Sequence, residues 1–352
     1  MSELQEFETL ADVIEASEGL LEVKGNFEDP DLPLAEVQHM VWSPHGRPTL
    51  AEQEDLVVNS KAVPERFGNF RNLLRTGLGL PIVGYSFYRA DGGANEIAAE
   101  IGAGLAKRGE NAVVMSPKKI IGRGVLDLNR PRDLSVGDRL FPMPDLVVQD
   151  LHGIFDISNG VIFRLFETLA GHKLKSVIQP HTMASGDPTD EEMDELAALA
   201  KEVSAGLRPG SAEFDDPDKV YALIAKWEMV YSNMNNRRNR EGVDVVNAVR
   251  VDVGGVKTLQ SVPDQGLSKR IAENFSQRGV PNFYNVPFSN LPGYPGSELA
   301  ILAGSRGFQQ ACFDVPRHLL MDDQSRAYHP LTFQPDPDQV QLIAAAVVEA
   351  IK

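Results

Sequence analysis

The fold is decided by residues 81–115, which read PIVGYSFYRADGGANEIAAEIGAGLAKRGENAVVM. The β-branched and aromatic run over 82–88 predicts a strand, and an Asp-Gly-Gly turn follows it. The next apolar residues recur at helical spacing on one face: Ile97, Ile101 and Leu105. The run at 112–115 predicts another strand, so this stretch indicates a parallel strand–helix–strand unit.

The same alternation continues to the C-terminus. Further strands are expected at 176–179, 245–251, 281–285 and 311–315. Helices are expected at 161–169, 189–207, 267–277 and 340–351. Thr189 with Glu192 has the form of a capping box, and Asp336-Pro337 places an N-cap acid before a first-turn proline. The pattern predicts an α/β fold of the phosphorylase/hydrolase-like kind over 76–352, with a mostly parallel, helix-covered sheet.

Residues 1–75 follow a different pattern. Apolar residues at helical spacing run through 2–17. Short strand-like stretches at 20–23 and 37–42 are separated by the turn-forming sequence DPDLP at 29–33. We interpret these residues as an N-terminal elaboration of the α/β domain, which serves either as a lid over the site or as a contact in a homo-oligomer.

Composition excludes several classes of function. The 352 residues include 34 Lys and Arg against 50 Asp and Glu, a net charge of −16. Such a surface repels phosphate backbones and anionic lipids, so neither nucleic acid nor a membrane is an expected partner. Cys312 is the only cysteine, which excludes an intramolecular disulfide and a multi-cysteine metal site. An acidic N-terminus without a long apolar stretch predicts a cytoplasmic protein.

Residues able to carry chemistry gather in four segments near predicted strand ends, where α/β sheets bind ligands. The segments are SFYRADGGANE at 86–96, RGVLDLNRP at 123–131, IQPHTM at 178–183 and FDVPRHLLMD at 313–322. Most have ordinary explanations: His181 as a structural histidine, 127–130 as a turn, Asp91 as a helix cap and Glu96 as a partner of the helix dipole. Asp314 is different, because a carboxylate in an apolar strand needs a partner or a purpose.

In their order, these segments resemble the N-formylglutamate amidohydrolase family, relatives of the zinc carboxypeptidases. The family has Asp-hydrophobic-Asn-Arg-Pro where this chain has 127–131, and an Asp-Leu-His-Ser-Met-like segment where it has 179–183. Near its end the family has Glu-hydrophobic-Asn-Arg-Ser-Leu-Tyr-Met-Asp, which corresponds to 314–322. Residues 285–288 with Gly293 and Gly296 are similar to the family's Asn-Asp-Pro-Tyr and glycine segment. The resemblance covers about residues 81–323.

The resemblance implies a zinc-dependent hydrolase that cleaves an amide bond in a small carboxylate-bearing substrate, such as an N-formyl or N-acyl amino acid. His181 would be a metal ligand, and Asp91 or Glu96 would be the carboxylate ligand. Asp314 would stand where the family has its general-base glutamate. Four residues would contact the anionic group of the substrate: Asn129, Arg130, Arg317 and Arg123.

The chain departs from the family at the first metal-ligand motif. The family has a histidine just after its first strand, where this chain has Tyr85-Ser86. The sequence SPHG at 43–46 is similar to that motif and makes His45 an alternative ligand. Without such a ligand, the chain would be a metal-free member that binds a carboxylate ligand or a partner without hydrolysis. Metal-free chemistry with Asp314 and His181 is a third alternative.

Two further features have an ordinary and a sharper interpretation. The basic run NNRRNR at 235–240 is either a solvated loop or an anion-binding loop over the site. Cys312 is either a small apolar residue of the predicted strand at 311–315 or a nucleophile.

Overall fold

The computed structural model describes residues 7–25, 29–45, 63–75, 91–118, 123, 125–136, 143–206, 216–253, 256–261, 266–285, 290–321 and 333–352. They are built around a seven-stranded sheet in the order β1 (Leu21–Gly25), β3 (Ala112–Pro117), β2 (His39–Trp42), β4 (Ser176–Met183), β9 (Gln309–Pro316), β5 (Val243–Val246) and β8 (Asn282–Tyr284). Strands β3, β2, β4 and β9 run parallel, whereas β1 and β5 run antiparallel to their neighbours β3 and β9. The predicted α/β fold with a mostly parallel sheet is confirmed.

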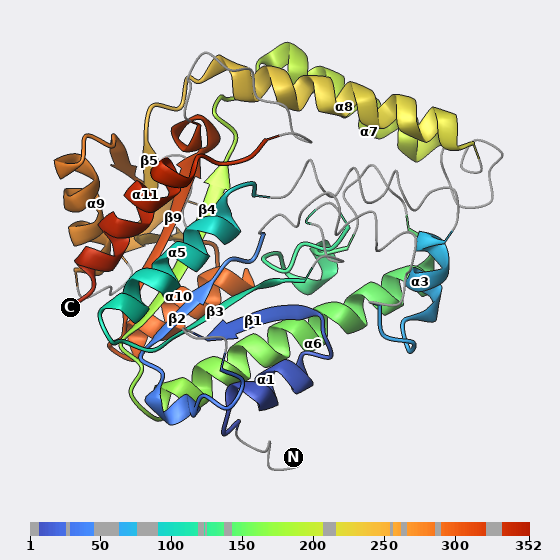
Figure 1. Cartoon of the computed structure of the whole chain (residues 1–352). Helices are drawn as coiled ribbons and strands as arrows, with labels where there is room; N and C mark the ends of the chain where they lie inside the picture. Colours follow the sequence, from blue (N-terminus) through green and yellow to red (C-terminus); the bar gives the residue numbers. More distant parts are fainter. Residues whose placement is uncertain are drawn as a thin grey trace.

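Helices cover both faces of this sheet (Figure 1). One face carries α5 (Ala94–Lys107), α9 (Leu267–Gln277) and α11 (Pro337–Ala350). The other face carries α1 (Leu10–Ala16), α6 (Asp145–Ala170) and α10 (Pro295–Ser305). The remaining elements are α3 (Gly68–Leu74), α7 (Asp190–Gly206), α8 (Pro217–Arg237), the paired strands β6 (Ala248–Val253) and β7 (Val256–Ser261), and the short turns η1 (Leu34–Glu36), η2 (Arg132–Leu134) and η3 (Arg317–Leu320). In the described part of the chain, no helix has the length and apolar character needed to cross a bilayer.

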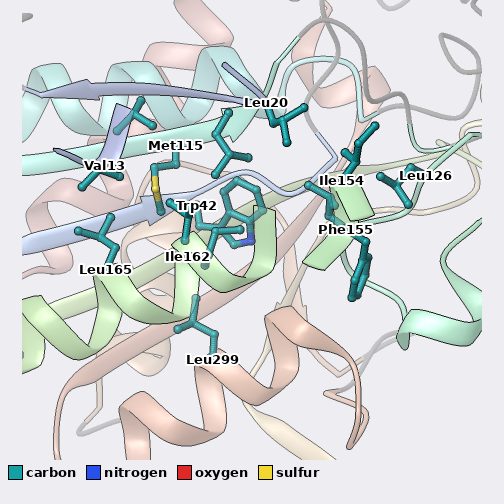
Figure 2. Close-up of a cluster of buried hydrophobic side chains, with 14 of the residues drawn as sticks. Val13, Leu20, Trp42, Met115, Leu126, Ile154, Phe155, Ile162, Leu165 and Leu299 are labelled. Atoms are coloured by element: carbon teal, nitrogen blue, oxygen red, sulfur yellow. The ribbon is translucent and has the colours of Figure 1, made fainter. Parts of the chain in front are cut away.

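Large apolar side chains fill the space between the sheet and α6 (Figure 2). Trp42 of β2 and Met115 of β3 share a cluster with Ile162 and Leu165 of α6 and Leu299 of α10. None of these side chains is more than 1% exposed, and burying each contributes about 1.5–3 kcal/mol. This packing fixes β2, and with it the start of the segment that follows β2.

The cap signals in the sequence are confirmed. Thr189 N–H donates to Glu192 Oε2 at 2.8 Å, and Glu192 N–H donates back to Thr189 Oγ1 at 3.2 Å. Asp336 Oδ1 accepts from the N–H groups of Asp338 and Gln339 at 2.9 and 3.0 Å, which starts α11. Helix α9 spans the predicted residues, whereas α6 begins well before the predicted start at residue 161.

Two strand boundaries differ from prediction. Strand β4 runs on through His181 despite Pro180: its pairing with β2 ends at Ile178, but its pairing with β9 continues as far as Met183. The stretch predicted as one strand over 245–251 is divided into β5 and β6. Asn285, in the left-handed region with φ 56°, accepts from the N–H groups of Asn247 and Ala248 at 3.0 Å and thereby holds the corner between them.

The N-terminal part of the chain belongs to the sheet. Strand β2 lies between β3 and β4, and β1 pairs with β3 at one edge. The predicted boundary at residue 75 therefore does not coincide with a division of the sheet. The strand predicted over 82–88 lies outside the described residues, as does the Tyr85-Ser86 pair.

Candidate active site

Two histidines and an aspartate meet beyond the carboxyl ends of the parallel strands. His45 follows β2, His181 lies near the end of β4, and Asp91 immediately precedes the turn into α5. Their candidate ligand atoms all lie within 4.8 Å of one another, and all three residues are buried. Asp91 Oδ2 is 3.4 Å from His45 Nδ1 and 3.2 Å from His181 Nδ1. This group could hold a metal ion.

Backbone contacts fix Asp91 between the two histidines. The Asp91 N–H donates to the His45 carbonyl at 2.7 Å. Thr182, next to His181, donates from its hydroxyl to the Gly92 carbonyl at 2.9 Å. Gly93 completes the turn with φ 96°, where a Cβ would lie 2.5 Å from a Leu320 methyl group. The N-cap of α5 is Gly93, so the interpretation of Asp91 as the helix cap is wrong.

Asp127 orients the first of these histidines. Its Oδ1 lies 2.6 Å from His45 Nε2 and also accepts from the Asn129 N–H at 3.0 Å. A neutral His45 that donates from Nε2 presents its Nδ1 lone pair toward Asp91, which is the arrangement of a metal-binding histidine with a carboxylate behind it. The turn predicted over 127–130 is therefore present, and it also serves the site.

The charges of the site favour a cation between the imidazoles and the carboxylates. Burial and Arg123 oppose protonation of His45, but Asp127 and Asp91 prevail and raise its pKa. Burial would raise the pKa of Asp91, yet Arg123 and the two histidines hold it well below its usual range. His45 Nδ1 is buried without a hydrogen-bond partner among the described residues, and two imidazoles with a carboxylate are a donor set that binds zinc, so the residues present fit a metal.

Arg123 ties the acids together. Its Nη1 lies 3.0 Å from Asp91 Oδ1, and its Nε lies 3.4 Å from Asp127 Oδ2. Burial would lower the pKa of Arg123, but Asp91 and Asp127 raise it, so it stays charged. The sequence suggested Arg123 as an anion contact, and the structure places it in ion pairs with two carboxylates of the protein itself.

A cavity of about 370 Å³ adjoins this cluster. The groups that line it include His45, His181, Asp314, the guanidinium residues Arg123, Arg130, Arg240 and Arg317, and Asn290, Tyr294 and Ser297 on the side of α10. His181 and Arg130, predicted from separate segments, thus face one cavity. Cys312 lines it too, and burial raises the pKa of its thiol well above the usual value, which disfavours a nucleophilic thiolate.

Asp314 lies beside His181 across the sheet. The two are register partners in β4 and β9, and Asp244 of β5 is the partner of Asp314 on its other side. Side chains of register partners emerge on the same face of a sheet. Burial raises the pKa of Asp314 to about 6; His181 opposes this shift, and the Asp91 and Asp244 carboxylates add to it.

Asn129, predicted to contact the substrate, forms a hydrogen bond with the backbone of the protein. Its Oδ1 accepts from the Gly296 N–H at 2.7 Å, and Gln179 Nε2 donates to the Gly296 carbonyl at 2.9 Å. A Cβ on residue 296 would lie 2.5 Å from Asn129 Oδ1, so the two amides grip a glycine. Asn129 therefore positions the first turn of α10 at the cavity, in addition to lining the cavity itself.

The predicted arginines reach the cavity in different ways. Arg130 Nε lies 3.2 Å from Asp127 Oδ2, and Arg317 is buried at the start of η3. In the basic run at 235–240, Arg237 pairs with Glu192, while Arg240 pairs with Asp187 at 2.6 Å and lines the cavity. Arg240 of this run thus borders the cavity, and binding of an anion by the run stays a prediction.

Glu96 is not part of the site. Its side chain is exposed in the first turn of α5, outside the metal-ligand group and the cavity lining. Of the two carboxylates suggested by the sequence, Asp91 is the one that the structure places with the histidines.

Sequence reasoning gave no role to Asp127, Gln179 or Asn290. For Asp127 the signal was its place at the head of the Asp-Leu-Asn-Arg-Pro segment.

Comparisons with known proteins add little to this geometry. No protein-family model and no curated protein matches the chain. A gene product of Agrobacterium tumefaciens of known structure is similar at 12% identity and a TM-score of 0.46, over 96% of this chain and 94% of that one. The structure of an N-formylglutamate amidohydrolase from Ralstonia eutropha is similar at 12% identity and a TM-score of 0.40, over 95% and 98%. We therefore derive function from the residues of the site.

Proposed function

We propose that the protein is a metal-dependent hydrolase that cleaves a C–N amide bond in a small carboxylate-bearing substrate, such as an N-formyl or N-acyl amino acid. The observation that carries this proposal is the buried group of His45, Asp91 and His181, whose two histidines line a cavity that Asp314 and Arg130 also line.

Two imidazoles and a carboxylate are a donor set of catalytic zinc sites, which leave a position open for substrate. The chemistry that zinc supplies there is Lewis-acid polarisation of a carbonyl and activation of water at neutral pH. The residues of the chain hold the ligands in place: Asp127 fixes the ring of His45, and the backbone contacts of Asp91 hold it between the histidines.

Asp314 is the general base in this proposal. With a pKa raised to about 6 by burial, its carboxyl is largely ionised at neutral pH and can accept a proton. It can return that proton to the leaving nitrogen, because a group with a pKa near the working pH serves in both directions.

Arg130 and Arg317 give the cavity its preference for an anion. Both line it, and a guanidinium offers several N–H donors in a plane that matches a carboxylate. Arg130 uses its Nε for Asp127, which aims the guanidinium beside the metal-ligand group. A substrate carboxylate bound there would place the neighbouring amide near the histidines.

A second candidate is a metal-free protein that binds a carboxylate ligand or a partner without hydrolysing it. The closed network favours it: Arg123 already pairs with Asp91 and Asp127, and both histidines contact Asp91. In that case Asp314 would have no reaction to serve.

The test is hydrolysis by the full chain of a panel of N-formyl and N-acetyl amino acids, before and after removal of metal with a chelator. We expect turnover that the chelator abolishes and added zinc restores. Turnover that survives complete metal removal would contradict the proposal. Absence of turnover in the zinc-loaded protein, with binding of the same compounds intact, would establish the second candidate instead.

A further inference from the structure

Asn290 carries a buried hydrogen-bond donor at the cavity. Its side chain is 4% exposed and the residue lines the cavity on the side of α10. Among the described residues, its Nδ2 has no hydrogen-bond partner. Buried polar groups in native proteins are nearly always paired, so such an atom needs an explanation.

The backbone of Asn290 is anchored to a neighbouring strand. The Asn290 N–H donates to the Ala248 carbonyl at 2.9 Å, and the Arg250 N–H donates to the Asn290 carbonyl at 2.8 Å. Asn285 in turn clamps the start of β6, where Ala248 lies. Both backbone groups of Asn290 are thus paired with β6, which fixes the position of its backbone beside the cavity.

The other amides of the cavity behave differently. Asn129 and Gln179 both bond the backbone of Gly296 and so have a structural task. Ser297 likewise accepts from the Leu291 N–H at 2.9 Å. Asn290 differs from these residues, because its Nδ2 has no hydrogen-bond partner in the described part of the chain. Burial of an unpaired amide costs free energy that an apolar side chain of the same size would not cost.

We propose that Asn290 is a specificity-determining residue, which donates a hydrogen bond to an acceptor oxygen on the amino-acid side chain of the substrate. This inference rests on the proposed function: the metal-ligand group takes the scissile amide, and Arg130 and Arg317 take the carboxylate next to it. The remaining group of such a substrate is its side chain. Val246, Leu291 and Cys312 line the same cavity and suit the methylene groups that would lead to that oxygen.

Two ligands that cannot be hydrolysed test this inference through binding alone. They are the N-methanesulfonyl derivatives of methionine sulfoxide and of methionine, which share one carbon skeleton and differ by a side-chain oxygen that can only accept a hydrogen bond. Calorimetry on the full, zinc-loaded chain should show at least tenfold tighter binding of the sulfoxide derivative, because a site with a buried donor rejects a ligand that leaves it unpaired. Asn290→Leu should bring the ratio close to one, and its melting temperature without ligand should be equal to or above that of the wild type.

Asn290→Asp is a second variant of nearly the same shape, and it should lose the preference because a carboxylate only accepts. Asn282→Leu, the same exchange in β8 away from the cavity lining, should keep it. A ratio near one in the wild type, or a ratio unchanged in both Asn290 variants, would overturn the inference. Absence of hydrolysis by the wild type, with the preference present and lost in the variants, would overturn the hydrolase and leave this subsite standing.

Discussion

The two ring nitrogens of His45 face two different carboxylates. Nε2 lies 2.6 Å from Asp127 and Nδ1 lies 3.4 Å from Asp91. The contact with Asp127 fixes the ring of His45. Its Nδ1 therefore faces Asp91 Oδ2, the same oxygen that His181 Nδ1 contacts. His45 thus decides whether the cluster has two imidazoles or one. A cluster with two could hold a metal ion, whereas a cluster with one would be an ion pair between His181 and Asp91.

At the same scale, Arg130 should govern affinity for the substrate carboxylate. Arg130→Ala should lower kcat/KM roughly thirtyfold on substrates with a free carboxylate, which corresponds to about 2 kcal/mol. The reason is the loss of the charged hydrogen-bonded pair between Arg130 and the substrate carboxylate. Steady-state kinetics on N-acetyl amino acids and on their carboxamides measure this difference. Arg132→Ala, which removes a surface pair with Asp156, is the control. An equal loss on the carboxamides would contradict the role.

His39 makes stability depend on pH at a place far from this chemistry. Its Nδ1 lies 2.9 Å from Ser176 Oγ and its Nε2 lies 3.2 Å from Glu110 Oε2. Burial lowers the pKa of His39 to about 4; Glu110 opposes the shift, and Lys175 and Arg108 add to it. The folded state therefore binds the proton less readily than the unfolded state does.

Because the folded pKa is depressed, stability is complete above the ordinary pKa of 6.5 and falls as the pH drops toward 4. The free energy of unfolding should lose about 3 kcal/mol over this range through His39 alone. Urea unfolding at a series of pH values measures this slope. His39→Gln should flatten it. An identical slope in His39→Gln would show that other groups carry the effect.

At the scale of elements, the first turn of α10 depends on a glycine. Asn129 and Gln179 hold Gly296 from both sides, and an added Cβ would lie 2.5 and 2.6 Å from their side-chain oxygens. Gly296→Ala should cost about 1–3 kcal/mol, because a packed region has to shift. It should also lower activity, since α10 forms one wall of the cavity.

Gly160 in α6 is the matched control. No heavy atom lies within 4 Å of a Cβ placed there, and the residue is exposed. Gly160→Ala should stabilise the protein by about 0.5–1 kcal/mol through the loss of backbone freedom in the unfolded chain. Denaturant unfolding of both variants tests the pair, and changes of the same sign would contradict this account of Gly296.

Elements were predictable where local signals decide them. The apolar stripe of α5 and the cap of α11 are both read from neighbouring residues, so both appear where expected. The extension of β4 past Pro180 depends on its pairing with β9, and the division at Asn247 depends on the side chain of Asn285. Such long-range contacts leave no local pattern in the sequence.

At the scale of the molecule, the site needs a strand order that periodicity does not reveal. Strand β2 comes from the N-terminal part of the chain, yet it lies beside β4 and brings His45 next to His181. The segment similarity found His181, Arg130 and Asp314, which all line the cavity. It left His45 as an alternative and Glu96 as a candidate, because neither spacing nor composition tells which residues the sheet brings together.

The whole chain carries a net charge of −16, but its cavity is lined by four arginines. Three of them pair with carboxylates of the protein: Arg123 with Asp91 and Asp127, Arg130 with Asp127, and Arg240 with Asp187. The contrast between an acidic exterior and an arginine-lined interior suits a small anion better than a large acidic partner.

We propose that His45, Asp91 and His181 bind one metal ion, and the metal content of the purified protein decides this. Mass spectrometry of the purified full chain should find about one zinc per chain in the wild type, as expected for a site with three protein ligands. His45→Ala and His181→Ala should each lose it, and Glu96→Gln should retain it. Full zinc occupancy in both histidine variants, or its loss in Glu96→Gln alone, would contradict the account.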